Sequence, residues 1–148
     1  MIQDDLKLKG QLEIVVTAQD GTVRQRESVK NLVVTSGKGY VASRMKDAST
    51  AVMSHMAIGT GSITPAAGNT VLGSESARVS LTSTTVNNND VVYVATFPAG
   101  TPSSSAAITE AGLFNASSGG TMLCRTVFGT ITKGTSDSLS ITWTVTAS

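Results

Sequence analysis

Catalytic chemistry in this chain would depend on a single imidazole. His55 is the only histidine and Cys124 the only cysteine in 148 residues, so a Ser-His-Asp or Cys-His arrangement within one chain must use His55 as its base. No Gly-x-Ser-x-Gly turn marks one of the 19 serines as a nucleophile. One histidine and one cysteine also cannot complete a four-ligand zinc site. We therefore expect no enzymatic activity and no metal, with His55 as a strand residue and Cys124 as a small core residue.

Residues 32–42 superficially match a dinucleotide-binding fingerprint. An apolar run is followed by Gly-x-Gly-x-x-Ala, with its small residues at Gly37, Gly39 and Ala42. The fingerprint binds a pyrophosphate only within a parallel strand–helix–strand unit. A β-hairpin is expected before this segment and antiparallel strands after it. We therefore interpret the glycines as shaping the bend into a short helix, and expect no cofactor.

Glu110 is the one carboxylate that the pattern places on an apolar strand face. The other residues of that face are Ile108, Gly112 and Phe114. A carboxylate in such a place needs a partner, and Arg78 or Arg125 from a neighbouring strand are the candidates. The remaining carboxylates beyond residue 47 are scattered and form no glycosidase-like pair. We interpret Glu110 as one half of a structural ion pair.

A basic cluster follows the first expected turn. Asp20-Gly21 is a dipeptide that suits a two-residue hairpin turn, and Arg24, Arg26 and Lys30 follow on the returning strand, interrupted by Glu27. No aromatic residue that would stack on bases lies among them. We interpret the segment as a protruding or edge ribbon that charge guards against unwanted strand pairing.

Alternating apolar residues predict eight strands joined by turns. They lie at about residues 6–16, 22–34, 53–58, 77–81, 91–97, 108–114, 122–128 and 138–145. The last is the clearest, because every second residue from Leu139 to Val145 is apolar. Thr35 or Ser36 begins the one expected helix, which continues to about Met45. The pattern favours an all-β fold, an antiparallel β-sandwich of the eight-stranded jelly-roll type with one short helix, in a single domain spanning residues 1–148.

Composition excludes several classes of function. The formal net charge is +1, which gives no reason to expect direct nucleic-acid binding. No stretch reaches 18 consecutive apolar residues, and the start lacks the pattern of a secretion signal. Threonine and serine supply 40 residues, whereas the 101 residues after position 47 carry only seven charges. Either hydroxyl groups solvate this region, or part of it faces other protein.

Three tracts resemble structural proteins of tailed-bacteriophage particles. The first, residues 30–42, has a strand, the pair Asn31-Leu32, small residues with glycine, and the start of a helix. The second comprises residues 56–61 (Met-Ala-Ile-Gly-Thr-Gly) together with residues 65–75. The third runs from residues 108–115 (Ile-Thr-Glu-Ala-Gly-Leu-Phe-Asn) to the strand of Trp143. The likeness covers most of residues 30–145 and contains no catalytic signature.

The resemblance implies a β-rich, non-enzymatic, oligomeric protein of the virion, assembled in the host bacterial cytoplasm. The size of the chain favours a capsid decoration, or cement, protein that bridges copies of the major capsid protein. A neck, collar, tail, baseplate or fibre component is the alternative station on the particle. A small hydrolase using His55 and a carbohydrate-binding module are more remote alternatives.

Two segments are expected to contact other virion subunits. One is an arm at residues 1–10, and the other is the ribbon at residues 22–30, because both are polar at mid-strand or near a terminus. The residues assigned to these contacts are Leu6, Leu8, Arg24, Arg26 and Lys30.

Overall fold

The computed structural model describes residues 6–46 and 50–148. In these ranges the chain forms nine strands and one helix. In chain order they are β1 (Leu8–Thr17), β2 (Val23–Val33), α1 (Thr35–Lys46), β3 (His55–Gly59), β4 (Glu75–Ser80), β5 (Ser83–Asn87), β6 (Asp90–Phe97), β7 (Ala106–Phe114), β8 (Met122–Lys133) and β9 (Ser138–Ala147). The prediction of an all-β fold with one short helix is confirmed.

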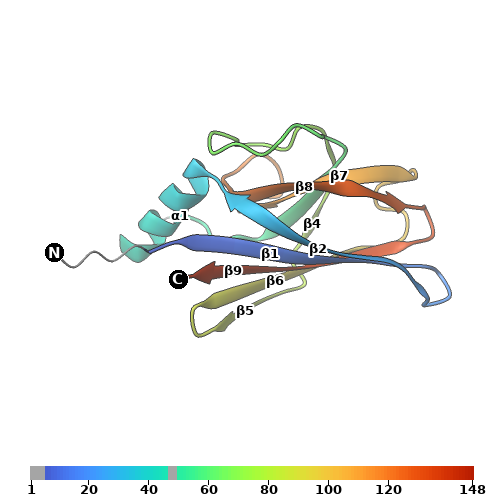
Figure 1. Ribbon diagram of the computed structural model, residues 1–148, viewed down its shortest axis with the longest axis horizontal. Helices are drawn as coiled ribbons and strands as arrows, with labels where there is room; N and C mark the ends of the chain where they lie inside the picture. Colours follow the sequence, from blue (N-terminus) through green and yellow to red (C-terminus); the bar gives the residue numbers. More distant parts are fainter. Residues whose placement is uncertain (1–5, 47–49) are drawn as a thin grey trace.

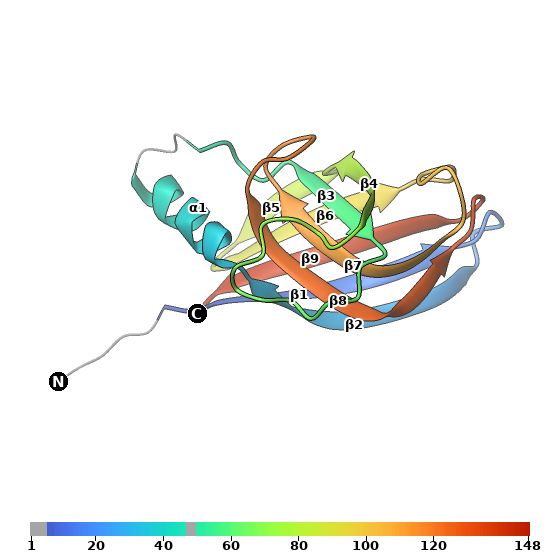
Figure 2. The same ribbon diagram turned by 90° about the horizontal axis from the view of Figure 1, so that it is seen from above.

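All nine strands belong to one antiparallel sheet that curls on itself. The strand order is β4-β3-β7-β8-β2-β1-β9-β6-β5. The half with β3, β4, β7 and β8 lies over the half with β1, β9 and β6, and α1 covers one open end (Figures 1 and 2). Contact between β4 and β6 draws the two ends of the sheet together. The apolar core fills the space between the two halves.

Strict alternation on two paired strands builds much of this core. β1 and β9 pair along their whole length, with Leu12 opposite Trp143 and Ile14 opposite Ile141. These four side chains are almost completely buried, as the alternation predicts. Each contributes roughly 1.5–3 kcal/mol by leaving water. A shift of one residue in register would expose the whole set, so the pattern fixes the pairing.

The first hairpin forms, but its turn is longer than the predicted two residues, because Gln19, Asp20 and Gly21 lie between Ala18 and Thr22, which are hydrogen-bonded to each other. Most of its second strand has a free edge. β1 and β2 pair from Gly10 to Thr17 around a turn at Gly21, whose φ of 87° requires glycine. On its other side β2 pairs with β8 only at Leu32 and Val33. Residues 23–31 therefore form the predicted edge ribbon within the described part of the sheet, and its charged side chains guard that edge.

Gly37 explains why the fingerprint-like segment contains glycine. α1 begins at Thr35, close to the predicted start. A Cβ atom on Gly37 would lie 2.0 Å from the carbonyl oxygen of Leu123 on β8, so only glycine lets the helix approach the sheet this closely. The same carbonyl accepts the backbone N–H of Val34. The interpretation of this glycine as a structural bend is thus supported by a specific contact.

The predicted number of eight strands was one too low. The missed strand, β5, has the sequence Ser-Thr-Thr-Val-Asn with every residue exposed, so it shows no apolar alternation. β5 exists because it pairs with β6 along residues 83–87, around a tight turn in which Asn88 has a positive φ of 56°. β8 likewise runs to Lys133, five residues beyond the predicted end, because it continues to pair with β7.

Part of the predicted N-terminal arm belongs to the sheet. Residues 1–5 lie outside the described residues. Lys7 exchanges backbone hydrogen bonds with Ser148, and Leu8 pairs with Ala147 at the end of β9. Residues 7–10 are therefore held by the sheet rather than free to extend, because their backbone groups bond to the C-terminal strand. Leu6, just before this pairing begins, is 70% exposed.

Candidate interaction surface

The two side chains best suited to catalysis have local structural surroundings. The Nδ1 atom of His55 lies 2.8 Å from the hydroxyl of Ser54, and its Nε2 atom lies 3.4 Å from the hydroxyl of Ser80. Both ring nitrogens face hydroxyls, so none of the carboxylates that the structure describes orients the ring as one does in a catalytic triad. Cys124 is fully buried, and burial raises the pKa of its thiol well above the usual value. Burial thus disfavours the thiolate form of Cys124 that a nucleophile needs.

Other chemical centres also find no support in residues 6–46 and 50–148. These residues contain no cluster of three or more histidine, cysteine, aspartate or glutamate side chains that could hold a metal ion. The helix they contain is too short and too polar to cross a membrane.

Glu110 is the centre of the most extensive buried polar network. Its carboxylate is completely buried on β7. The Oε2 atom accepts the backbone N–H groups of Gly61 and Ser74, each at 2.7 Å, and Oε1 accepts the N–H of Gly73 at 2.8 Å. Burial raises the pKa of Glu110, but these backbone hydrogen bonds and the guanidinium of Arg125 outweigh it, so the net shift is downward. Glu110 is thus held ionised.

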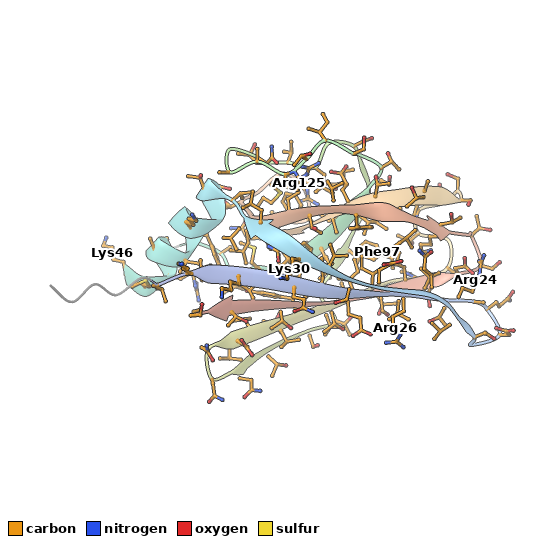
Figure 3. The ribbon with its side chains drawn as sticks, in the orientation of Figure 1. Arg24, Arg26, Lys30, Lys46, Phe97 and Arg125 are labelled. Atoms are coloured by element: carbon orange, nitrogen blue, oxygen red, sulfur yellow. The ribbon has the colours of Figure 1, made fainter. Side chains whose placement is uncertain are left out.

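Of the two arginines expected as partners, Arg125 contacts Glu110. Its Nη2 atom lies 2.9 Å from Oε1 of Glu110, and its side chain is 2% exposed. The other end of the guanidinium donates to the carbonyl oxygen of Ile63 at 3.0 Å and to Oδ1 of Asn69 at 3.2 Å. Arg125 lies below the loop that crosses β8 (Figure 3). The pair therefore connects β7 and β8 to residues 60–74, named here the latched loop.

Arg78, the other expected partner, belongs to a separate cluster. Its guanidinium lies 3.8 Å from the ring centre of Phe114 and pairs with Glu75 at 2.7 Å. It also donates to the carbonyl oxygens of Ala116 and Gly119. Arg78 therefore fixes the β7–β8 turn against β4, and of the two candidate partners of Glu110 it is the one that pairs elsewhere.

The two arginines of the ribbon are engaged within the chain. Arg24 pairs with Asp137 at 2.5 Å, and Arg26 pairs with Glu13 on β1. The backbone N–H of Gly134 and the Arg24 guanidinium lower the pKa of Asp137. Nearby Lys133 is buried and donates to two carbonyl oxygens, those of Pro98 and Asp137. Sequence analysis missed this lysine, because its burial depends on where the 134–137 turn folds.

Lys30 differs from these arginines because it has no acidic partner among the described residues. With Lys9 and Lys38 it lines a groove with a volume of about 790 Å³ on the outer side of β1, β2 and β9, named here the lysine groove. Hydroxyl side chains of β9 (Thr142, Thr144 and Thr146) form part of its lining. Glu13 also lines it but is paired with Arg26. Figure 3 shows Lys30 between the helix end of the molecule and the two ribbon arginines.

A second hollow, of about 340 Å³, lies beside the helix and is named here the apolar pocket. Its lining is mostly aliphatic and aromatic: Leu8, Tyr40, Val41, Arg44, Met45, Asn89, Val91, Tyr93, Leu123, Val145 and Ala147. Burial raises the pKa of Tyr93, which stays a neutral phenol. At the rim, the side chain of Met45 is 77% exposed. Leu8, one of the residues expected to contact other subunits, lines both hollows.

The latched loop is the functional feature that sequence analysis did not identify. Sequence analysis placed it only between the strands expected at residues 53–58 and 77–81. The available signal was the spacing of glycines, because Cβ atoms on Gly59 or Gly61 would lie 2.7 and 2.4 Å from the Glu110 carboxylate. That residues 59–61 and 73–74, two glycine-containing segments, surround one carboxylate becomes recognisable only when their proximity in space is known.

Comparison with known proteins does not identify a family. No protein-family model matches the chain, and no curated protein and no solved structure is significantly similar to it.

Proposed function

We propose that this chain is a non-enzymatic structural protein of a tailed-bacteriophage particle, and specifically a capsid decoration protein that bridges neighbouring subunits of the major capsid protein. The observation that carries the proposal is the lysine groove. Three lysines without acidic partners in the described chain line one concave face, while Arg24, Arg26 and Arg125 are all bonded within the chain.

The mechanism is adhesion rather than catalysis. A groove with unpaired lysines and a hydroxyl-rich lining suits an acidic, extended segment of a neighbouring capsid subunit. Each contact is weak by itself, but many copies on one particle act together. The curled sheet supports this role as a rigid carrier. The proposal also holds that the fold is a sandwich of the jelly-roll type and that the chain forms a homo-oligomer.

The location that follows is the virion, with assembly in the cytoplasm of the host bacterium. Contact with nucleic acid or a membrane is not part of the mechanism, because no aromatic side chain lines the lysine groove to stack on bases. A neck, collar, tail, baseplate or fibre position is the second candidate, since it needs the same adhesive chemistry at a lower copy number. A small hydrolase has no support from the surroundings of His55, and a carbohydrate-binding module has none from Trp143, which is fully buried.

The test is the amount of this protein on purified particles from cells that carry its gene. Quantitative mass spectrometry should find hundreds of copies per particle for a decoration protein, and about a dozen or fewer for a ring or tail component. The Lys30→Glu variant should lose occupancy, and its loss should be greatest at low salt, where charge pairing is strongest.

Lys7→Glu provides the matched control. Lys7 is an exposed lysine near the same end of the sheet, but it does not line the groove. Its reversal changes net charge equally and should lower occupancy less than Lys30→Glu does, because the contacts expected of residues 1–10 are assigned to the apolar Leu6 and Leu8. Particles that lack the protein would refute the proposal, and equal occupancy of the two variants would remove the groove from it.

A further inference from the structure

The latched loop presents two large aliphatic side chains to solvent. Ile63 is 76% exposed and Val71 is 63% exposed. Residues 60–74 contain no charged side chain at all. Their surface therefore loses little charge solvation when another protein covers it, which favours an apolar partner surface.

The same loop is fixed at several points along its length. The two ends are held by Glu110, through the N–H groups of Gly61, Gly73 and Ser74. The middle is held where the backbone N–H of Thr35 donates to the carbonyl oxygen of Ala67. Leu72 anchors it from below in a small apolar cluster. A loop that is already ordered pays little conformational entropy on binding, so its exposed aliphatic groups are suited to docking.

The chain also carries a pocket suited to an inserted aliphatic side chain such as Ile63, which is named here the knob. The apolar pocket, about 340 Å³, is lined mainly by apolar side chains, and none of its lining residues belongs to the latched loop. Its size is at the lower end of the roughly 300–1,000 Å³ typical of binding pockets. The formal net charge of +1 means that two copies repel each other only weakly.

We propose that the latched loop of one copy docks into the apolar pocket of a second copy, with Ile63 as the inserted side chain. Because knob and pocket are different surfaces, the contact is heterologous, and repetition closes a ring or extends a chain. Glu110 and Arg125 are positioning residues for this contact. The proposal does not rest on a location in the virion.

The test compares self-association of the purified protein and three variants by sedimentation velocity and native mass spectrometry. Ile63→Asp changes the knob and Met45→Asp changes the rim of the pocket, and both side chains are exposed, so folding is preserved. Val86→Asp is the matched control, because Val86 is 71% exposed and belongs to neither surface. The wild type and the control should assemble beyond the dimer, and the other two should associate about tenfold or more weakly, as expected for loss of one interface anchor.

Mixing the two defective variants gives the sharpest outcome. Ile63→Asp keeps an intact pocket and Met45→Asp keeps an intact loop, so an equimolar mixture should form a heterodimer that grows no further. The proposal is overturned if the wild type stays monomeric up to about 1 mM, if either variant assembles like the wild type, or if the mixture stays monomeric. None of these outcomes affects the measurement of the protein on particles. A monomeric wild type would remove the homo-oligomer from the proposed function but leave the decoration role standing, so the two proposals are tested separately.

Discussion

Replacing Glu110 by glutamine should destabilise the protein by about 3–5 kcal/mol, because it leaves the buried Arg125 without its counter-charge. The amide nitrogen adds a second cost. If it occupies the Oε2 position it faces the N–H groups of Gly61 and Ser74, and if it occupies the Oε1 position it faces Gly73 and Arg125. A loss of this size is a large part of the 5–15 kcal/mol that stabilises a typical domain.

Urea unfolding followed by tryptophan fluorescence measures this loss directly. Trp143 is the only tryptophan and is fully buried, so its emission reports unfolding of the core. Glu13→Gln is the matched control, because it removes an ion pair whose two side chains are 47% and 60% exposed and should cost at most about 1 kcal/mol. Adding Arg125→Met to the Glu110→Gln variant should recover part of the loss, since it removes the orphaned charge.

Limited proteolysis distinguishes a local effect from a global one. Cleavage within residues 60–74 should become faster in Glu110→Gln under conditions where the wild type and Glu13→Gln resist. A loss of stability below about 1 kcal/mol, together with an uncut loop, would show that the carboxylate does not hold the latched loop and that our account of the network is wrong.

Two further changes test the fold and its titration. Gly37→Ala should destabilise the protein by about 1–3 kcal/mol or more in thermal unfolding, because its Cβ would overlap the carbonyl of Leu123. Gly39→Ala is the control, because no atom lies near its Cβ, and it should stabilise α1 by about 0.5–1 kcal/mol. Equal effects of the two substitutions would contradict the close approach of α1 to β8. Folding lowers the pKa of Glu110 below its usual value of 4.5, so its stabilisation is complete above that pH and is lost as pH falls through the folded pKa. Urea unfolding between about pH 5 and 3 should therefore show a smaller decline in stability for Glu110→Gln than for the wild type, and parallel declines would contradict this.

The local alternation of apolar and polar residues was sufficient to predict structure where one face of an element is buried along its whole length. The alternation in β9 and β1 predicted which side chains enter the core, since a strand exposes every second residue to the same environment. The start of α1 was predicted within a residue, but not its cap, because the carbonyl of Val34 accepts the first helical N–H, from Lys38, and the Ser36 hydroxyl donates instead to the carbonyl of Met122 on β8. β5 was missed for the opposite reason, since both of its faces are exposed and its pairing with β6 alone makes it a strand.

The choice between partners depended on distances that sequence does not contain. Glu110 had two arginines as candidates, and the curl of the sheet placed Arg125 against it while Arg78 turned toward Phe114. The basic ribbon was likewise divided by its neighbours. Arg24 pairs with Asp137 of the 134–137 turn, and Arg26 pairs with Glu13 of β1. Lys30 has no acidic partner among the described residues.

The sequence alone determined that this protein is all-β and that Glu110 lies on an apolar strand face. These properties follow from residue type and from a period of two, which act within a single strand. Tertiary structure alone decided that residues 60–74 form a fixed loop, that Lys9, Lys30 and Lys38 share a groove, and that an apolar pocket opens beside α1. Each of these joins segments far apart in the chain, and only the curl of the sheet brings such segments within the few ångströms over which hydrogen bonds and apolar contacts act.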